Sequence, residues 1–314
     1  MTATPSAGAP LEPQQHAVGR TVALLVDSER ADRVLGIDVW YPAAVDDGPR
    51  SVYELLPGVG FTAAAFADAP AAPGVHPLLV WSHGRSGTRS SYGLLCEGLA
   101  SRGYVVIAPD HPGDTLGDWL LGAAVDDATN EAQRVDDVRF VLDSALGVRA
   151  GFDLAPAIDT ERIAVAGHSY GAFTALALGG AENTDPRVRA VAGLQSLTRT
   201  LSHETLARIS VPTMLIVGSQ DQTTPPETDA DRAFEALRDS ARRVDVERAG
   251  HQACSDVGLY LELAPEVEGL PDIVFEFLQS MAADVTGTPG DPWRPTVELH
   301  LRTLGDWLDD VLDR

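Results

Sequence analysis

Short apolar runs recur along the chain, and segments with helical spacing separate them. From residue 77 onward, such runs cover 77–84, 104–113, 162–171, 188–196, 213–221 and 242–251. Strands covered on both faces of a parallel sheet are almost continuously apolar, as most of these runs are. The last run is more polar, so we expect it at an edge. This pattern restricts the chain to a sheet of mostly parallel strands.

Two earlier runs and the helical segments complete the predicted architecture. Residues 21–26 and 33–42 have the pattern of an antiparallel pair, which Pro42 ends. Apolar residues recur at helical spacing in 88–102, 131–148, 170–180, 226–240, 265–283 and 295–312. Alternating strands and helices predict an α/β protein with an eight-stranded, mostly parallel, doubly wound sheet and helices on both faces.

The predicted domain follows a short N-terminal tail. Residues 1–18 do not resemble a signal peptide. Because they are rich in Pro, Ala and Gln, we expect them to be disordered. Residues 19–314 show no second domain and are predicted to fold as one. The segment 43–76 is expected to be an excursion or flap. The link between 188–196 and 213–221 is short, which predicts that no large cap domain is inserted there.

Charge and composition narrow the classes of partner. The 314 residues contain 46 Asp and Glu against 23 basic residues, all of them Arg, for a formal net charge of −23. The lack of Lys excludes a Schiff base, a Ser–Lys dyad and a P-loop. The acidic excess repels nucleic acid and anionic lipid, so neither is an expected partner. With only two cysteines, the chain has no disulfide framework, which predicts a reduced, cytoplasmic protein. No run of roughly 20 apolar residues is present, so no membrane span is expected.

The segment AVAGHSYGAF, residues 164–173, places Ser169 between a predicted strand and a predicted helix. Gly167 and Gly171 flank the serine and keep side chains away from a tight turn. Such a turn exposes the serine Oγ above the sheet and points the N–H of Tyr170 outward at a helix N-terminus. Ser169 is therefore a candidate nucleophile, although a small residue in any strand–helix turn gives the same local pattern.

Two side chains that a serine nucleophile needs follow later strands. Asp221 lies in LIVGSQDQTTPP and His251 in ERAGHQACSD. A neutral imidazole must take the serine proton, and a carboxylate must hold the imidazole tautomer and stabilise the imidazolium. The order Ser, Asp, His is that of an α/β-hydrolase. Asp221 could instead be a turn residue, and Glu227 is a weaker alternative acid because it follows two prolines.

The loop WSHGRSG, residues 81–87, completes the candidate site. It follows the run 77–84 and is positioned to supply the backbone N–H of Arg85 opposite the N–H of Tyr170. Two such donors form an oxyanion hole for a tetrahedral intermediate, and each typically accounts for roughly 3 kcal/mol of transition-state stabilisation.

The chain resembles bacterial α/β-hydrolases close to the platelet-activating-factor acetylhydrolase-like group, often labelled predicted dienelactone hydrolases. The matching segments are DVWYPA, SHGRSGTRSSYGLLCEGLASRGYVVIAPDHPGDT, GHSYGAFTALAL, VPTMLIVGSQDQTTPP and AGHQACSD, which together span about residues 20–260. The resemblance implies a metal-free serine hydrolase of carboxylic esters, with the triad Ser169, Asp221 and His251 and an oxyanion hole at Arg85 and Tyr170. Dienelactone hydrolases use Cys as the nucleophile, so that label does not identify the substrate.

The substrate pocket is less constrained. Four side chains are candidate pocket residues: His83 and His111 near strand ends, Trp119 in the segment 115–127, and Gln195. The two histidines could equally brace loops through hydrogen bonds, and Trp119 could face a core. We expect walls from 115–127, 43–76 and the C-terminal helices, and we expect His300 at a helix surface. DHPGD, residues 110–114, offers one His and two Asp, which is too little to predict a metal site.

Together these features predict a serine carboxylesterase that forms an acyl-enzyme and acts on short-chain, aryl or lipid-type esters, with no cofactor. An amidase, a peptidase or a thioesterase could use the same triad. A hydrolase-like scaffold that only binds a ligand would carry the fold without the turnover.

Overall fold

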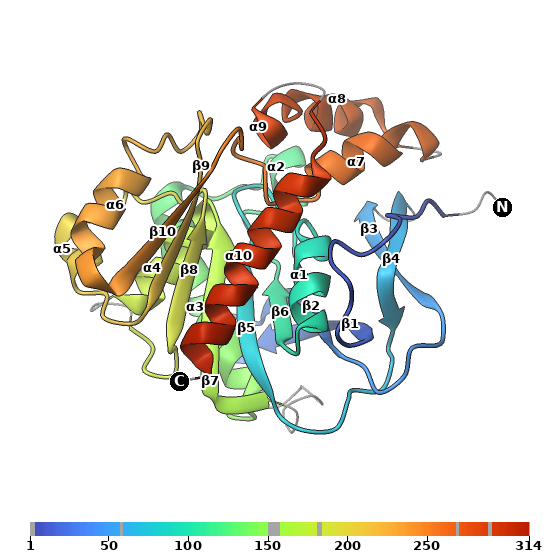
Figure 1. Cartoon of the computed structure of the whole chain (residues 1–314), viewed down its shortest axis with the longest axis horizontal. Helices are drawn as coiled ribbons and strands as arrows, with labels where there is room; N and C mark the ends of the chain where they lie inside the picture. The colour runs from blue at the N-terminus through green and yellow to red at the C-terminus, as the bar shows by residue number, and fades with distance from the viewer. Residues whose placement is uncertain are drawn as a thin grey trace.

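The computed structural model describes residues 4–56, 59–149, 158–180, 184–267, 270–287 and 291–313. The strands in these residues are β1 (Val18–Asp27), β2 (Arg33–Pro42), β3 (Arg50–Leu56), β4 (Val59–Ala67), β5 (His76–Ser82), β6 (Val105–Pro109), β7 (Ile158–His168), β8 (Ala190–Leu194), β9 (Thr213–Gly218) and β10 (Ala241–Val246). Over the described residues they form one ten-stranded sheet in the order β10-β9-β8-β7-β5-β6-β2-β1-β4-β3 (Figure 1).

All eight predicted strands are present in the sheet. β1 pairs antiparallel with β2 along its whole length, and β2 pairs antiparallel with β6. From β6 to β10, all neighbouring strands are parallel. The antiparallel pairing of the first two strands and the edge position of the last are therefore confirmed.

The sheet is larger than predicted because the 43–76 segment forms a hairpin. β3 and β4 pair antiparallel, and β4 also pairs in parallel with the start of β1. The β4 sequence VGFTAAAFA is rich in Ala and Gly, which have low strand propensity, so the pattern alone does not indicate a strand. Its neighbours in the sheet determine its conformation.

The helices are α1 (Gly93–Ser101), α2 (Leu116–Leu120), α3 (Asp127–Ala145), α4 (Tyr170–Gly179), α5 (His203–Ala207), α6 (Ala230–Leu237), α7 (Val257–Leu263), α8 (Asp272–Ser280), α9 (Ala283–Thr286) and α10 (Arg294–Leu312). α1 and α10 cover one face of the sheet, and α3, α4 and α6 cover the other (Figure 1). Val80 and Trp81 of β5 belong to opposite apolar clusters, because successive strand side chains point to opposite faces.

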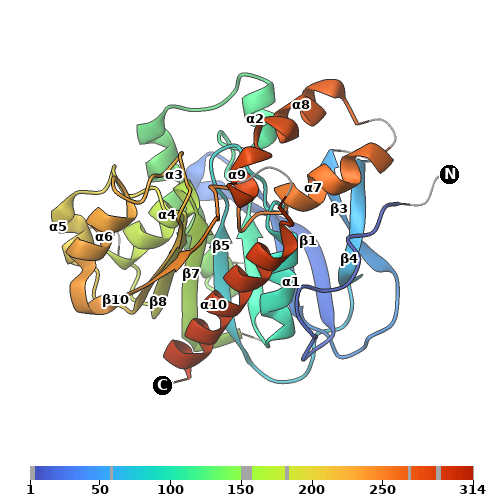
Figure 2. The same ribbon diagram turned by 45° about the horizontal axis from the view of Figure 1, so that its top comes forward.

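The chain after β10 differs from the single helix predicted over 265–283. α7 begins already at Val257, and α8 begins only at Asp272. Pro265 lies in a 3-10 turn after α7, and Pro271 precedes α8, because proline starts helices but cannot continue them. α2, α7, α8 and α9 lie together over one end of the sheet (Figure 2). None of the helices in the described residues is long and apolar enough to cross a membrane.

The N-terminal segment also differs from the prediction, which was disorder through residue 18. Residues 5–7 bond to β4: the N–H of Ala7 donates to the carbonyl of Thr62 at 2.8 Å, and the N–H of Thr62 donates to the carbonyl of Pro5 at 2.8 Å. Leu11 is buried. Composition does not reveal this packing, because β4 and α1 supply the surface from elsewhere in the chain.

Candidate active site

Ser169 lies at the junction between β7 and α4, with φ 55° and ψ −114°. This backbone conformation is strained for a residue with a side chain, and it turns the serine out of the strand direction. The turn is very crowded: a Cβ atom added to Gly171 would lie 1.8 Å from the carbonyl oxygen of Ser82, and one added to Gly167 would lie 2.5 Å from Gly171. Only glycine fits at both positions.

Ser169, His251 and Asp221 meet at the carboxyl ends of the parallel strands. Asp221 follows β9, and His251 follows β10. The Oγ of Ser169 lies 3.1 Å from Nε2 of His251, and Nδ1 of His251 lies 2.8 Å from Oδ2 of Asp221. All three residues are buried. The structure therefore joins the three predicted side chains in one hydrogen-bonded chain, whereas the alternative acid Glu227 is exposed.

Asp221 is held as an acceptor by the turn that follows it. Its Oδ1 accepts hydrogen bonds from the backbone N–H groups of Thr223 and Thr224, both at 2.8 Å, and the Oγ1 of Thr224 lies 2.7 Å from Oδ2. Burial alone would raise the pKa of Asp221, but hydrogen bonds from His251 and Thr224 outweigh burial and hold that pKa below its ordinary value. Thr224 was missed in the sequence, although the DQTT spacing is typical of an Asp-led turn.

His168 supports His251 through the backbone carbonyl of His251. Its Nε2 lies 2.7 Å from the carbonyl oxygen of His251, which can only accept, so Nε2 carries the proton. Its Nδ1 then accepts from the hydroxyl of Tyr92 at 2.7 Å, and that hydroxyl oxygen accepts from the N–H of Gly84 at 3.3 Å. Burial, together with the neighbouring His251, lowers the pKa of His168 to about 3. The side chain is a neutral bridge at neutral pH.

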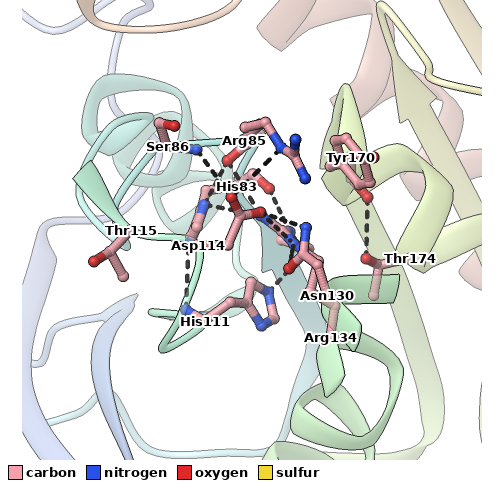
Figure 3. Close-up of polar contacts among 12 residues, drawn as sticks. His83, Arg85, Ser86, His111, Asp114, Thr115, Asn130, Arg134, Tyr170 and Thr174 are labelled. Atoms are coloured by element: carbon pink, nitrogen blue, oxygen red, sulfur yellow. Dashed lines mark hydrogen bonds and ion pairs between the residues drawn. The ribbon is translucent and has the colours of Figure 1, made fainter. Parts of the chain in front are cut away.

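Two backbone N–H groups without a partner in the described part of the chain belong to residues beside the serine. Within the described residues, no acceptor of the chain pairs with the N–H of Arg85 or with the N–H of Tyr170. Both residues line one cavity together with Ser169. The side chains also meet, because the Arg85 guanidinium lies 4.6 Å from the centre of the Tyr170 ring and pairs with Asp127 at 2.5 Å. Figure 3 shows the guanidinium and the ring facing each other.

The cavity above Ser169 has a volume of about 390 Å³, within the usual range for small-molecule sites. Its apolar walls come mainly from the helices over the end of the sheet: Leu116, Trp119, Val257, Phe277, Leu278 and Met281. The rings of Trp119 on α2 and Phe277 on α8 lie 5.1 Å apart between centroids. Trp119 thus lies where the pocket prediction placed it, but none of the described residues of 43–76 lines the cavity.

His83 and His111 do not line this cavity and instead brace loops. Nδ1 of His83 donates to the carbonyl oxygen of Gly84 at 2.7 Å, and its Nε2 accepts from the N–H of His111 at 3.2 Å. His111 lies between the hydroxyl of Ser82 and the carboxylate of Asp137, at 2.9 and 3.0 Å. Both residues do follow strand ends, as expected. Their rings, however, contact polar groups beneath the 81–87 loop and do not line the cavity.

Gln195 also lies outside the cavity lining. Its side-chain nitrogen lies 2.9 Å from Nε2 of His300, and Nδ1 of His300 donates to the carbonyl oxygen of Thr296 at 2.7 Å. His300 itself is fully buried rather than at a helix surface, because α10 packs this face of the helix on the sheet. The pair connects the loop after β8 to α10.

This burial predicts an acid-sensitive fold. Burial lowers the pKa of His300 to about 4, whereas an unfolded histidine titrates near about 6.5. Between these values the unfolded chain binds more protons than the folded one, so the free energy of unfolding falls as the pH drops from about 6.5 to about 4, by about 3 kcal/mol from this group.

Urea unfolding of the His300→Gln variant should therefore show a shallower loss of stability over this pH range than the wild type. Glutamine keeps an acceptor for the Gln195 amide but cannot titrate. The same change at the exposed His203 should leave the pH slope unchanged. Equal slopes for His300→Gln and the wild type would contradict the assignment of this pH dependence to the buried imidazole.

Comparisons with known proteins identify the family of the chain. A family profile described as PET hydrolase-like matches residues 60–261, more than half of the chain. A probable 1-alkyl-2-acetylglycerophosphocholine esterase from Arthroderma benhamiae is 32% identical over 112 residues, which cover 32% of this chain and 27% of that protein. The match thus spans about a quarter of the curated relative's length.

A solved structure matches over almost the whole chain. It is a ferulic acid esterase from Streptomyces cinnamoneus, which superposes with a TM-score of 0.76 at 24% sequence identity and covers 99% of this chain and 94% of its own. This likeness concerns the fold, and the profile match concerns the family. The chain therefore belongs to the PET hydrolase-like family, a group of ester hydrolases with the α/β-hydrolase fold.

Proposed function

We propose that this protein hydrolyses carboxylic esters through an acyl-enzyme on Ser169. One observation carries the proposal: the unbroken hydrogen-bonded chain from Ser169 through His251 to Asp221, at the floor of an apolar cavity. A serine hydroxyl is a weak nucleophile unless a base takes its proton. The arrangement supplies that base, and a carboxylate that stays ionised at neutral pH because its pKa is lowered.

In the first half-reaction, Nε2 of His251 accepts the Oγ proton while Oγ attacks the ester carbonyl. Asp221 accepts the Nδ1–H of His251 and stabilises the imidazolium. The imidazolium then protonates the leaving alkoxide, and the C–O bond breaks. In the second half-reaction, the neutral imidazole deprotonates water, which attacks the acyl-enzyme. The C–Oγ bond then breaks, the imidazolium returns its proton to Oγ of Ser169, and the carboxylic acid is released.

The N–H groups of Arg85 and Tyr170 act as the oxyanion hole in this proposal. Both amides lack a partner within the described part of the chain, and both residues line the cavity beside Ser169. Preorganised donors of this kind stabilise charge that develops only in the transition state, so they raise turnover more than substrate affinity.

The cavity supports a compact and mainly apolar substrate. A volume of about 390 Å³ with aromatic walls at Trp119 and Phe277 fits a short acyl chain or an aryl group. The names of the acetylglycerophosphocholine and ferulic acid esterases denote an acetyl ester and an aromatic acid ester, which agree with this class. The net charge of −23 disfavours polyanionic substrates.

The purified protein is expected to hydrolyse p-nitrophenyl acetate and butyrate, and to act more slowly on the matching p-nitroanilides, whose leaving group is poorer. A fluorophosphonate probe should leave its adduct on the peptide that contains Ser169, detected by mass spectrometry, with heat-denatured protein as the control. Faster cleavage of anilides or thioesters would reassign the substrate class. No turnover of any ester, together with no adduct, would favour a ligand-binding protein instead.

A further inference from the structure

Arg134 is a buried cation beneath the loop that carries Arg85. It lies on α3, and its side chain is fully inaccessible to solvent. Its Nη2 and Nε donate to Oδ2 of Asp114 at 2.7 and 3.0 Å, and the Asp114 side chain is only 5% exposed. Asn130 joins the pair, since its amide donates to Asp114 at 2.7 Å. Figure 3 shows this group directly below the loop.

Stability alone does not explain this ion pair. Burial penalises the charged guanidinium and lowers the pKa of Arg134 despite the carboxylate beside it. Replacing a buried ion pair with well-packed apolar side chains is often neutral or stabilising, and the best-attested use of such pairs is to impose one arrangement. The contacts of Arg134 beyond Asp114 indicate which arrangement it imposes.

The guanidinium fork binds two consecutive backbone carbonyls of the loop. Nη1 donates to the carbonyl oxygen of His83 at 2.7 Å, and Nη2 donates to that of Gly84 at 3.2 Å. The Gly84 oxygen also accepts from the N–H of Gly87 at 3.1 Å and from Nδ1 of His83. This carbonyl is therefore held toward the protein interior by several donors, one of which is charged.

The carbonyl of Gly84 and the N–H of Arg85 belong to the same peptide group. The described residues contain no cis peptide bond, so the two groups lie in one rigid plane and point in opposite directions within it. Fixing the Gly84 oxygen toward the buried Arg134 therefore directs the Arg85 N–H away from Arg134, and both Gly84 and Arg85 line the cavity with Ser169. A cation on the carbonyl also polarises the peptide and strengthens its N–H as a donor.

We infer that Arg134, held by Asp114, is a positioning residue that aims the N–H of Arg85 into the cavity as an oxyanion donor. This inference rests on the proposed ester hydrolysis, in which that N–H binds the tetrahedral oxyanion. Arg134 touches neither the substrate nor Ser169, and it acts only through the Gly84–Arg85 peptide group.

Arg134→Lys keeps the charge but removes the fork, because one ammonium cannot bind Asp114 and both carbonyls in the same geometry. Displacing a catalytic group by about 1 Å can lower the rate about 100-fold. The kcat for p-nitrophenyl acetate should therefore fall by about 10- to 100-fold, while KM changes by less than about 2-fold. The inhibition constant of phenylboronic acid, which forms a tetrahedral anion on the serine, should rise by a similar factor.

Arg20→Lys is the matched control. Arg20 is also buried, pairs with Asp38 and donates to the carbonyl of Val52 at 2.8 Å, but it lies on β1 rather than on the helix beneath the loop. The free energy of unfolding of Arg20→Lys should fall about as much as that of Arg134→Lys. Its kcat and its affinity for the boronate should stay at the wild-type level. An equal fall of kcat in both variants, or an unchanged kcat in Arg134→Lys, would overturn the inference while leaving the proposed function intact.

Asp114→Asn covers the case in which Arg134→Lys does not fold. The amide oxygen can still accept from Arg134, but the ionic component is lost, so a smaller fall of kcat at constant KM is expected. Full activity of this variant, with an unchanged boronate inhibition constant, would also overturn the inference. Wild-type protein that turns over no ester and takes no fluorophosphonate adduct would instead reject the proposed function, and this inference with it.

Discussion

Ser169→Ala should lower kcat for p-nitrophenyl acetate by about 10⁶-fold, the cost typical of removing a triad nucleophile. Alanine has no Oγ, so no acyl-enzyme can form, while the cavity and the backbone donors remain. KM should change little for the same reason. The variant should fold, because alanine is smaller than serine and, among the described residues, the Ser169 hydroxyl has His251 as its one hydrogen-bond partner. Stopped-flow and steady-state assays with mass spectrometry for the adduct measure the effect.

Ser255→Ala is the matched control for the nucleophile. Ser255 lines the same cavity, but its hydroxyl donates to the carbonyl of Gln252 rather than facing His251. Its replacement should leave turnover within about 5-fold of the wild type, since a single neutral hydrogen bond contributes about 1 kcal/mol. Retained activity in Ser169→Ala would reject the assignment of the nucleophile, whatever the control shows.

Asp221→Asn should lower kcat by about 10⁴-fold, because it imposes the wrong tautomer on His251. The two backbone N–H groups of Thr223 and Thr224 require an acceptor, so the amide oxygen of the new asparagine will occupy the place of Oδ1. Its NH2 group then faces Nδ1 of His251 and donates to it. The imidazole proton moves to Nε2, which can no longer accept the proton of Ser169.

The exposed Glu227 provides the control for the acid. Glu227→Gln should leave kcat unchanged, because its side chain lies outside the hydrogen-bonded chain. The one-bond nitrogen–proton coupling of His251 in each variant, measured by NMR, reports the tautomer directly. A wild-type tautomer in Asp221→Asn, or a loss of turnover in Glu227→Gln that exceeds the loss in Asp221→Asn, would contradict the role of Asp221.

The supports of the site were not predictable from local patterns. Tyr92 and His168 join the Gly84 N–H to the backbone of His251 across three separate segments of the chain. Arg134 lies on a helix whose sequence predicts only an amphipathic surface, yet it is fully buried against a loop about 50 residues earlier. No spacing rule connects such pairs, because hydrogen bonds between distant segments depend on how the elements pack.

The pocket residues were also not predictable from their positions along the chain. Proximity to strand ends suggested His83, His111 and Gln195, but a side chain after a strand can point above the sheet or into the layer beside it. Trp119 lines the cavity because α8 brings Phe277 against it.

The sequence by itself determined the parallel strands, the strand–turn–helix around Ser169 and the order of the candidate triad, because periodicity and tight-turn chemistry are local properties of the chain. Only the tertiary structure decided the β3–β4 extension of the sheet, the walls of the cavity and the contact between Arg134 and the Gly84 carbonyl. Each of these depends on contacts between segments far apart in the chain, and their geometry is set when the helices and loops pack on the finished sheet.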